Sequence, residues 1–216
     1  MSIIVAWPSV DIVEANDTAG VWKAQGYATA VLVETKEEKQ PNIDTIIYEP
    51  EWAGFPTAAN KLCQSLASNF DIVVIGGNDL FPVTTKTAQE LEKEFKEHFK
   101  GTLGLMHPTG DRYGSIDIVS VCPWIGAQYI KTMYGGYGPY YSGYYHYFCD
   151  AELQDVAVKN NLFWQRPDLS QFHDHWGRNG SSRPEHLMAA NTRHTADKAT
   201  YEHRKQHNFP GSGGPR

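Results

Sequence analysis

The segment Gly76-Gly77-Asn78-Asp79 directly follows an apolar run at residues 71–75. An acid placed after two glycines can sit where the backbone comes close to a phosphate group, because glycine has no side chain to obstruct the approach. Hard divalent cations prefer oxygen ligands such as a carboxylate. This pattern indicates a site in which Asp79 is a metal ligand and Gly77 and Asn78 lie beside a phosphate. A simple β-turn is the competing interpretation, since Gly, Asn and Asp are common turn residues.

A second cluster is His173-Asp174-His175, late in the chain. A spacing of two residues puts both imidazoles on one face of a strand, and a neutral imidazole is a good metal ligand. One of these histidines, Asp79 and two phosphate oxygens would complete a site for Mn²⁺ or Mg²⁺. A polar surface loop is the alternative. A structural zinc site is a further alternative, although no cysteine pair lies nearby to complete it.

A pair of acids, Asp150 and Glu152, follows a run rich in tyrosine. Either carboxylate is a candidate general base that would deprotonate an acceptor hydroxyl. The rings of Tyr144, Tyr145 and Tyr147 would then form the walls of an acceptor site. Helix capping by the acids and core packing by the rings are the competing interpretations.

Arg166 follows a short apolar run at residues 162–164. Its guanidinium is suited to pairing with a phosphate of a bound substrate. A surface salt bridge would explain it equally well.

The elements that position these residues alternate along the chain. Apolar runs predict buried strands at residues 3–7, 28–33, 44–48, 71–75, 103–106, 116–121 and 162–164. Helical spacing predicts helices at 10–25, 57–68, 84–100 (capped by Thr84 or Thr85) and 150–160, and a polar helix at 185–206. Strands that alternate with helices predict a single α/β domain with a mostly parallel, Rossmann-like sheet flanked by helices. We expect this domain to span residues 1–182, with a polar helix and a flexible tail in 183–216.

Composition and charge narrow the class of protein. A chain of 216 residues can bury a core without disulfides. Its three widely spaced cysteines indicate reduced thiols, and no run is long enough to span a membrane. The first residues lack the layout of a signal peptide, so we expect a cytoplasmic protein. The net charge of −6 argues against a protein that mainly coats nucleic acid.

The order of the pieces over residues 3–176 resembles the GT-A fold of nucleotide-sugar glycosyltransferases, most closely glycosyltransferase family two. Trp7-Pro8-Ser9 resembles the loop after the first strand that holds the nucleobase in that family. Glu34 resembles the acid at the end of the second strand. Gly54 to Asn60 resembles the glycine loop and the helix that carries an asparagine. Residues 75–79 occupy the place of the DxD motif, with Gly77 where the first acid would stand.

Three late motifs also have counterparts in that family. Asp150 to Leu153 is similar to the helix start that carries the catalytic base. Gln165-Arg166 is faintly similar to the Q-x-x-R-W element. His173 or His175 resembles the histidine that completes the metal site.

The resemblance implies a metal-dependent transfer of a sugar from a nucleotide-diphosphate donor, expected to be a UDP-sugar, to an acceptor hydroxyl with inversion. A retaining reaction on the same fold is the alternative stereochemistry. Trp7, Pro8, Ser9, Glu34, Asn60, Gly77, Asn78 and Arg166 are the donor-binding candidates. A non-catalytic binding protein, a decayed transferase, is the rival that the missing first acid supports. A nucleotidyltransferase ranks lower because no Gly-rich basic loop follows the first strand.

Residues 183–207 form the one basic region of this acidic chain. They carry Arg183, Arg193, Lys198, Arg204 and Lys205, against Glu185, Asp197 and Glu202, and also His186, His194, His203 and His207. A solvated helix that packs across the domain is one interpretation. The other is a platform for an anionic acceptor such as DNA bearing hydroxymethylated bases, with the aromatic run stacking an extruded base. A carbohydrate acceptor would use the same rings without the basic segment.

Overall fold

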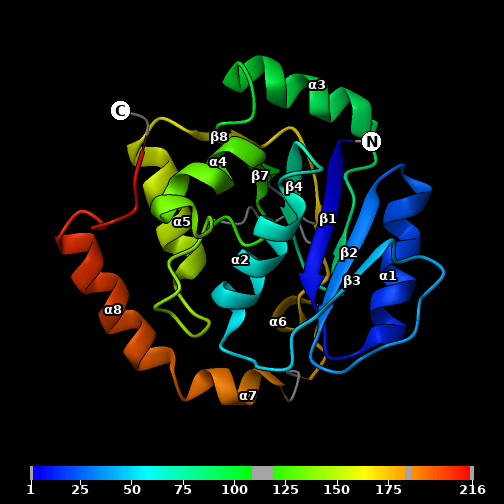
Figure 1. The fold of residues 1–216 in the computed structure, drawn as a ribbon, viewed down its shortest axis with the longest axis horizontal. Helices are drawn as coiled ribbons and strands as arrows, with labels where there is room; N and C mark the ends of the chain where they lie inside the picture. The colour runs from blue at the N-terminus through cyan, green and yellow to red at the C-terminus, as the bar shows by residue number, and fades with distance from the viewer. Residues whose placement is uncertain (1, 109–118, 183–185, 215–216) are drawn as a thin grey trace.

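Seven strands form one sheet in the order β3-β2-β1-β4-β7-β6-β8 (Figure 1). The structure is a computed structural model and describes residues 2–108, 119–182 and 186–214. The strands are β1 (Ile3–Pro8), β2 (Ala28–Val33), β3 (Thr45–Tyr48), β4 (Ile72–Ile75), β6 (Leu105–Pro108), β7 (Trp124–Gly126) and β8 (Phe163–Arg166). Strand β7 pairs antiparallel with β4 and β6, and the other pairings are parallel. The expected mostly parallel α/β fold is therefore confirmed.

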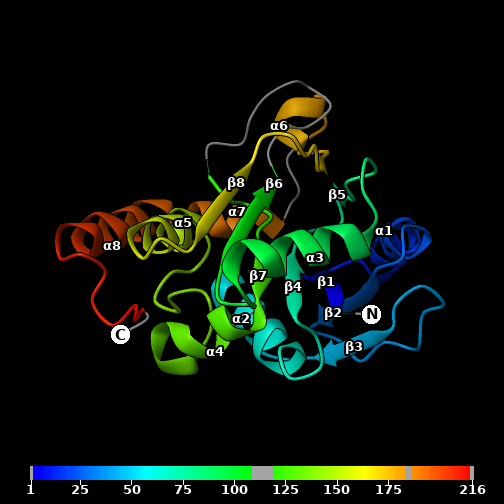
Figure 2. The ribbon, with the colours of Figure 1, turned by 90° about the horizontal axis from the view of Figure 1, so that it is seen from above.

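Helices cover both faces of the sheet (Figures 1 and 2). Helices α1 (Ile12–Ala24) and α3 (Ala88–Phe99) bury their apolar residues in one core cluster. Helices α2 (Phe55–Leu66), α4 (Ala127–Thr132) and α5 (Cys149–Lys159) bury theirs in the other. Strand β1 contributes residues to both core clusters, because its side chains alternate between the two faces of the sheet. Ile4 and Ala6 face one side, while Ile3, Val5 and Trp7 face the other. A strand that is buried on both faces has a continuous run of apolar residues, and this run is why β1 could be predicted from the sequence.

The smaller elements lie around this frame. Strands β5 (Leu80–Phe81) and β9 (Phe172–His173) form a separate antiparallel pair. A short 3-10 helix, η1 (Met133–Gly136), follows α4, and α6 (Trp176–Asn179), α7 (His186–Asn191) and α8 (His194–Gln206) complete the chain. None of the helices in the described part of the chain has the length and apolar character needed to cross a lipid bilayer.

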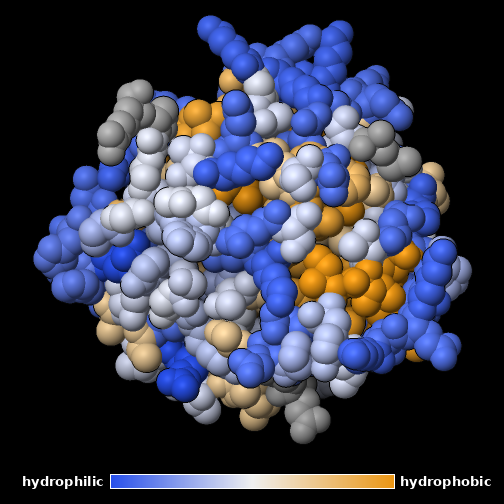
Figure 3. All heavy atoms as spheres, in the orientation of Figure 1, coloured by the Kyte–Doolittle hydropathy of each residue, from blue (hydrophilic) through white to orange (hydrophobic). Residues whose placement is uncertain are grey.

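Strand β3 is one of the two edge strands of the sheet, and its residues are only half-buried or exposed. The space-filling view shows an apolar patch on this side of the molecule, and polar side chains surround it (Figure 3). The patch marks the end of the sheet that α2 covers least.

Two local predictions were wrong. The cap of α3 is Thr87, whose Oγ1 accepts a hydrogen bond from the Glu90 amide at 3.2 Å while the Glu90 carboxylate accepts one from the Thr87 amide at 2.7 Å. This reciprocal pair satisfies two helix-end donors, which Thr84 and Thr85 cannot do. Of the strand predicted at 116–121, positions 116–118 lie outside the described residues and positions 119–121 are not in a strand, whereas strand β7 lies at residues 124–126. Strand β7 is stabilised by pairing with β4 on one side and β6 on the other. Local sequence propensity does not reflect such pairing.

The C-terminal segment also differs from the prediction. Instead of one helix there are two, because the Thr192 and Arg193 amides bond to carbonyls three residues back and the Thr192 hydroxyl also binds the Ala189 carbonyl at 2.7 Å. The tail expected to be flexible packs on the domain. Phe209 and Ser212 are buried, and the Ser212 carbonyl accepts a hydrogen bond from the Tyr134 amide at 3.0 Å. The domain division at residue 182 stays a prediction.

Candidate active site at the carboxyl edge of the sheet

The order of the strands reverses between β1 and β4, and the loops after these two strands leave the sheet side by side. In open α/β sheets, ligands bind outside the carboxyl ends of the strands at such a switch point. The loop after β4 contains Asp79, and the loop after β1 contains Ser9. The topology therefore puts both predicted motifs at the position where this class of sheet binds ligands.

Asp79 lies in contact with His173, one of the two histidines proposed as its partner in a metal site. The antiparallel pairing of Leu80 with His173 brings β5 and β9 together, and the Asp174 amide donates to the Asp79 carbonyl at 2.8 Å. His173 Nε2 then lies 3.4 Å from Asp79 Oδ2. The ring of His175 lies 5.2 Å from that of His173, and His175 Nδ1 accepts from the Gly177 amide at the start of α6.

The electrostatics of this pair favour an ionised carboxylate. Burial by itself would raise the pKa of Asp79, but the hydrogen bond and charge of His173 outweigh it and lower that pKa from its ordinary value. The buried Nδ1 of His173 has no hydrogen-bond partner among the described residues. The carboxylate is an oxygen ligand of the kind that hard divalent cations prefer, and the imidazole would be a second ligand in its neutral form.

No group of three or more His, Cys, Asp or Glu side chains in the described ranges is arranged to hold a metal ion. Mg²⁺ is commonly bound through one or two carboxylates, with substrate phosphates and water supplying the other ligands. The Asp79–His173 pair fits that kind of site and not an all-protein metal site.

Gly77 and Asn78 shape the loop that carries Asp79. A side chain at Gly77 would put its Cβ 2.8 Å from Asp79 Oδ1. Asn78 ties the loop to the neighbouring elements: its Oδ1 accepts from Trp7 Nε1 at 2.7 Å, and its Nδ2 donates to Ser9 Oγ at 3.1 Å and to Glu14 at 2.7 Å. The side chain of Asn78 therefore holds the switch point together.

The residues predicted to bind the nucleobase separate into two groups. Trp7 has no exposed surface and packs in the core, so its ring offers no face to a base. Pro8 and Ser9 lie beside the end of β2, where the Ser9 amide bonds to the Leu32 carbonyl at 2.9 Å, and exposed Glu34 follows that strand. Adjacent strand ends thus bring Pro8, Ser9 and Glu34 to one edge of the sheet, and their role in binding a nucleobase stays a prediction.

Two other donor-binding candidates have protein partners. Asn60 is buried and makes two hydrogen bonds to the backbone of Tyr140, at 2.9 and 3.0 Å. Arg166 is buried and pairs with Asp168 through two nitrogens, at 2.6 and 2.8 Å, and with Glu94 at 2.8 Å. The salt-bridge interpretation of Arg166 therefore accounts for its hydrogen bonds.

The two acids at the start of α5 have different surroundings. Asp150 is half-buried, and its Oδ1 accepts from the Ala151 amide at 2.8 Å. Burial raises the pKa of Asp150, which brings the carboxylate closer to the range in which general bases work. Since α5 leads directly into β8, its first turn lies at the carboxyl edge of the sheet.

Glu152 has no exposed surface, and its carboxylate is fully occupied within the protein. It accepts hydrogen bonds from the hydroxyls of Tyr134 and Tyr144, each at 2.7 Å, and from Arg204 Nε and Nη2 at 2.7 to 3.1 Å. The geometry therefore favours Asp150 of the two candidate bases.

The tyrosines predicted to line the acceptor site also differ in exposure. Tyr144 is buried, and its hydroxyl is the partner of Glu152. Tyr145 and Tyr147 are half-buried. The guanidinium of Arg193 lies 5.7 Å from the ring centre of Tyr145, and the Tyr147 hydroxyl donates to Asn191 at 2.7 Å. Both rings therefore lie where the predicted catalytic domain meets the C-terminal helices.

The sequence analysis missed Asp197 and Arg204 as buried residues. Asp197 is 4% exposed and Arg204 6% exposed, although both belong to a polar helix. They stand seven residues apart, two helical turns, with Tyr201 between them on the same face. This spacing is the sequence pattern that indicates a buried helix face. It was overlooked because Asp197 and Arg204 are charged residue types, which are usually exposed.

Two hollows are lined by described residues, and neither contains the acids. One, of about 260 Å³, lies between Asn60, Pro210, Gly211 and the segment Tyr134–Ser142. The other, of about 460 Å³, shares Tyr141 and Pro210 with it and reaches Arg204 of α8. Both lie beside the C-terminal tail and not at the switch point.

Comparison with known proteins gives a fold-level likeness only. No family model matches the sequence, and no curated protein matches it. Among solved structures, the chain is similar to a glycosyltransferase involved in the glycosylation of the major capsid of PBCV-1. The similarity covers 77% of this chain and 82% of that one at 11% identity, with a TM-score of 0.44. A likeness this weak carries no argument about function.

Proposed function

We propose that this protein is a metal-dependent glycosyltransferase that uses a nucleotide-sugar donor. The observation that carries the proposal is the contact between Asp79 and His173 at the switch point of the sheet. The order of the motifs in the sequence, to which Asp79 and His173 belong, supports the same proposal. The missing first acid of the DxD motif, Gly77, is the one feature that favours the rival function, a binding protein without transferase activity.

Asp79 and His173 are the residues that would hold Mn²⁺ or Mg²⁺, with His175 beside them. The cation, when bound, would offset the negative charge that develops on the leaving diphosphate. Pro8, Ser9 and Glu34 would contact the nucleobase, which we expect to be uracil. The tie between Asn78 and the first strand would keep this edge rigid.

Asp150 would act as the general base. Its carboxylate takes the proton of the acceptor hydroxyl while that oxygen attacks the anomeric carbon and the nucleoside diphosphate leaves from the opposite side. One displacement of this kind inverts the anomeric configuration. The raised pKa of Asp150 supports the assignment, because a stronger base accepts the proton more readily.

The acceptor is a carbohydrate or a hydroxymethylated DNA base. The salt bridges of the C-terminal segment weaken the case for DNA: Arg204 pairs with Glu152, Lys205 with Asp155 and Lys198 with Glu202. Paired cations contribute less to phosphate binding than free ones. A carbohydrate acceptor is therefore the one we favour.

The test is a thermal-shift measurement with UDP-glucose, UDP-galactose, UDP-N-acetylglucosamine and GDP-mannose, each with and without Mn²⁺. A ligand at 100 times its Kd stabilises the folded state by about 2.7 kcal/mol, so a donor should raise Tm. We expect one UDP-sugar to do so only with Mn²⁺, and Asp79→Ala to lose the effect. Asp17→Ala, at an exposed aspartate, is the matched control. A shift that survives in Asp79→Ala would contradict the metal assignment, and release of UDP on turnover separates an enzyme from a binding protein.

A further inference from the structure

The carboxylate of Asp197, on α8, is held by three consecutive backbone amides. Its Oδ1 accepts from the Tyr145 amide at 3.0 Å, and its Oδ2 accepts from the amides of His146 and Tyr147, each at 2.9 Å. The residue is 4% exposed. Hydrogen bonds to an ionised acceptor are roughly twice as strong as neutral ones, so this is a firm link between α8 and the segment before α5.

The same segment is also tied to α2. The Tyr145 carbonyl accepts from the Phe55 amide, in the first turn of α2, at 2.8 Å. A Cβ at Gly54 would lie 2.4 Å from that carbonyl oxygen, so the contact needs a glycine there. The backbone of Tyr145 therefore bridges two helices, since its carbonyl binds α2 and its amide binds α8.

Side chains from the C-terminal helices continue this contact. The rings of His146 and Tyr147 lie 4.9 Å apart, and the ring of Tyr147 lies 4.8 Å from that of His194. Phe55, in turn, lies 5.8 Å from His146. A row of rings thus runs from the start of α2 to the start of α8, and it includes Tyr147, one of the residues predicted to contact the acceptor.

Arg204 anchors α8 two turns further on. It pairs with Glu152 and lies 3.4 Å from the ring centre of Tyr141. Glu152 stands in the first turn of α5, two residues after Asp150. Both views of the fold show α8 along the outer side of α5 (Figures 1 and 2). The two anchors together define where the first turn of α5 lies relative to α8.

We propose that Asp197 is a positioning residue for the acceptor side of the site. By holding the amides of residues 145–147, it orients the rings of Tyr145 and Tyr147 and the start of α5, which carries Asp150. The C-terminal helix is then part of the catalytic apparatus. The inference rests on the proposed glycosyl transfer, and it predicts a defect confined to the acceptor, because Asp79 and His173 are held by a different pair of strands.

The test compares Asp197→Asn with Asp155→Asn in the full-length chain. Both remove one carboxylate charge from the contact with α8, but Asp155 binds Lys205 and Tyr201 on the surface and holds no backbone amide in the described structure. We expect Asp197→Asn to lower kcat/KM for the acceptor by about tenfold to a hundredfold, the range that a small misplacement of reacting groups produces. Donor affinity should change by less than about twofold, and the amides of residues 145–147 should exchange hydrogen faster. Asp155→Asn should resemble the wild type in all three measurements.

Two outcomes would overturn the inference. One is an acceptor kcat/KM of Asp197→Asn within about twofold of the wild-type value. The other is a loss of donor affinity as large as the loss of acceptor kcat/KM, which would mean that the variant disturbs the whole site. If Asp197→Asn does not fold, Asp197→Glu keeps the charge but displaces it by one methylene, and the same selective loss is expected. A wild-type protein that binds no donor and transfers no sugar would refute the proposed function itself. Normal transfer by both the wild type and the Asp197 variants would refute only the positioning role.

Discussion

Asp150 and Glu152 share one helical turn, yet their surroundings give them opposite properties. Glu152 is ionically paired and wholly buried, while Asp150 lacks a cationic partner among the described residues and is half-buried. A buried acid without a counter-charge holds its proton more tightly, and this is the source of the raised pKa of Asp150. The surroundings of the two acids, and not their residue types, make Asp150 a candidate base and Glu152 a structural residue.

We predict that Asp150→Asn gains stability relative to the wild type as pH rises. Because folding raises the pKa of Asp150, the folded state binds its proton more tightly than the unfolded state does. The wild type therefore loses stability as pH rises above the ordinary aspartate value of about 4, and the variant has no such loss. Urea denaturation at pH 3.5 and 6.5 measures the difference, with exposed Asp17→Asn as the control. A difference that does not depend on pH would contradict the burial of Asp150.

We predict that Arg204→Met is strongly destabilising. Removing one partner of a buried ion pair leaves the other charge unpaired and costs about 3–5 kcal/mol. The double variant Glu152→Gln/Arg204→Met should recover part of that loss, because neither charge remains. Chemical denaturation of the two variants and of Lys205→Met, which breaks an exposed pair on the same helix, provides the comparison. A loss below about 1 kcal/mol in Arg204→Met would show that Glu152 is not held as described.

At the scale of elements, the segment between α4 and α5 depends on backbone contacts more than on regular structure. Tyr134 adopts a positive φ of 51°, and Gly138 approaches Asn60 so closely that a Cβ would lie 2.1 Å from its side-chain oxygen. Asn60 binds both the amide and the carbonyl of Tyr140. The segment is therefore held by its neighbours, and the short 3-10 helix η1 is its one regular element among the described residues.

We predict that Gly54→Ala disrupts this segment. Gly54 has a φ of 103°, and the new Cβ would meet the Tyr145 carbonyl oxygen at 2.4 Å, so the start of α2 and residue 145 must move apart. Gly26→Ala is the matched control, because Gly26 also has a positive φ, of 85°, but no atom within 4 Å of the added Cβ. The control should lose about 1–2 kcal/mol from the left-handed backbone, and Gly54→Ala clearly more. Equal losses in urea denaturation would contradict the close contact with residue 145.

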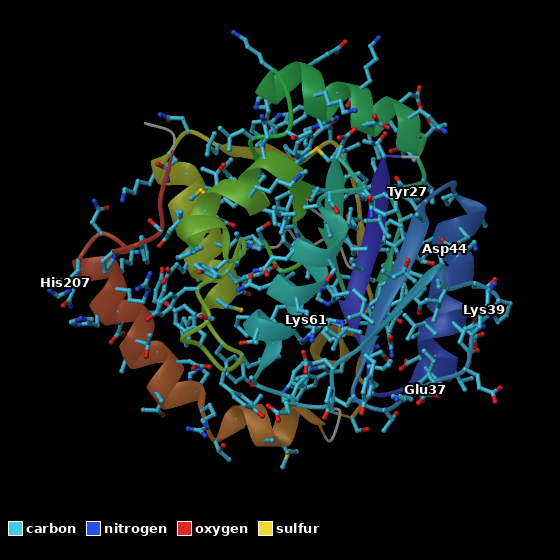
Figure 4. All side chains as sticks on the ribbon, viewed as in Figure 1. Tyr27, Glu37, Lys39, Asp44, Lys61 and His207 are labelled. Carbon is cyan, nitrogen blue, oxygen red and sulfur yellow. The ribbon has the colours of Figure 1, made fainter. Side chains whose placement is uncertain are left out.

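At the scale of the whole molecule, the C-terminal segment behaves as part of the fold. Figure 4 shows His207 at the outer end of α8, on the opposite side of the molecule from Tyr27 and Asp44. From there the chain turns back, and Phe209 and Ser212 bury themselves near η1. Helix α8 thus spans one flank of the domain and closes over α5.

We predict that a chain ending at Ser182 loses cooperative unfolding. It would lack Arg204 and Asp197, which leaves Glu152 buried without its cation and the amides of residues 145–147 without their acceptor. Thermal melts followed by circular dichroism test this, with a chain ending at Gly214 as the control. A Ser182 chain that melts cooperatively at the wild-type temperature would show that the C-terminal helices are dispensable for the fold.

The sequence by itself determined the alternation of strands and helices. Runs such as residues 28–33 and 71–75 are buried on both faces of the sheet, and such burial leaves a continuous apolar pattern that needs no knowledge of neighbours. The order of the motifs also made Asp79 and a late histidine joint candidates, although the contact between them depends on the separate antiparallel pairing of β5 with β9. The cap at Thr87 was also readable in principle from the Glu90 three residues later.

Only the tertiary structure decided which polar residues are functional candidates and which are anchors. Residue type or the family resemblance made Glu152, Asn60, Arg166 and Trp7 candidates for ligand contacts. Each has a protein partner far along the chain, namely Arg204, Tyr140, Glu94 and Asn78, at separations of 52, 80, 72 and 71 residues. Arg166 also has a local partner, Asp168. The burial of Asp197 in a polar helix has the same origin. Local pattern reports the period of a helix or strand, whereas a side chain's partner depends on which distant segment packs against it, and that packing exists only in the folded chain.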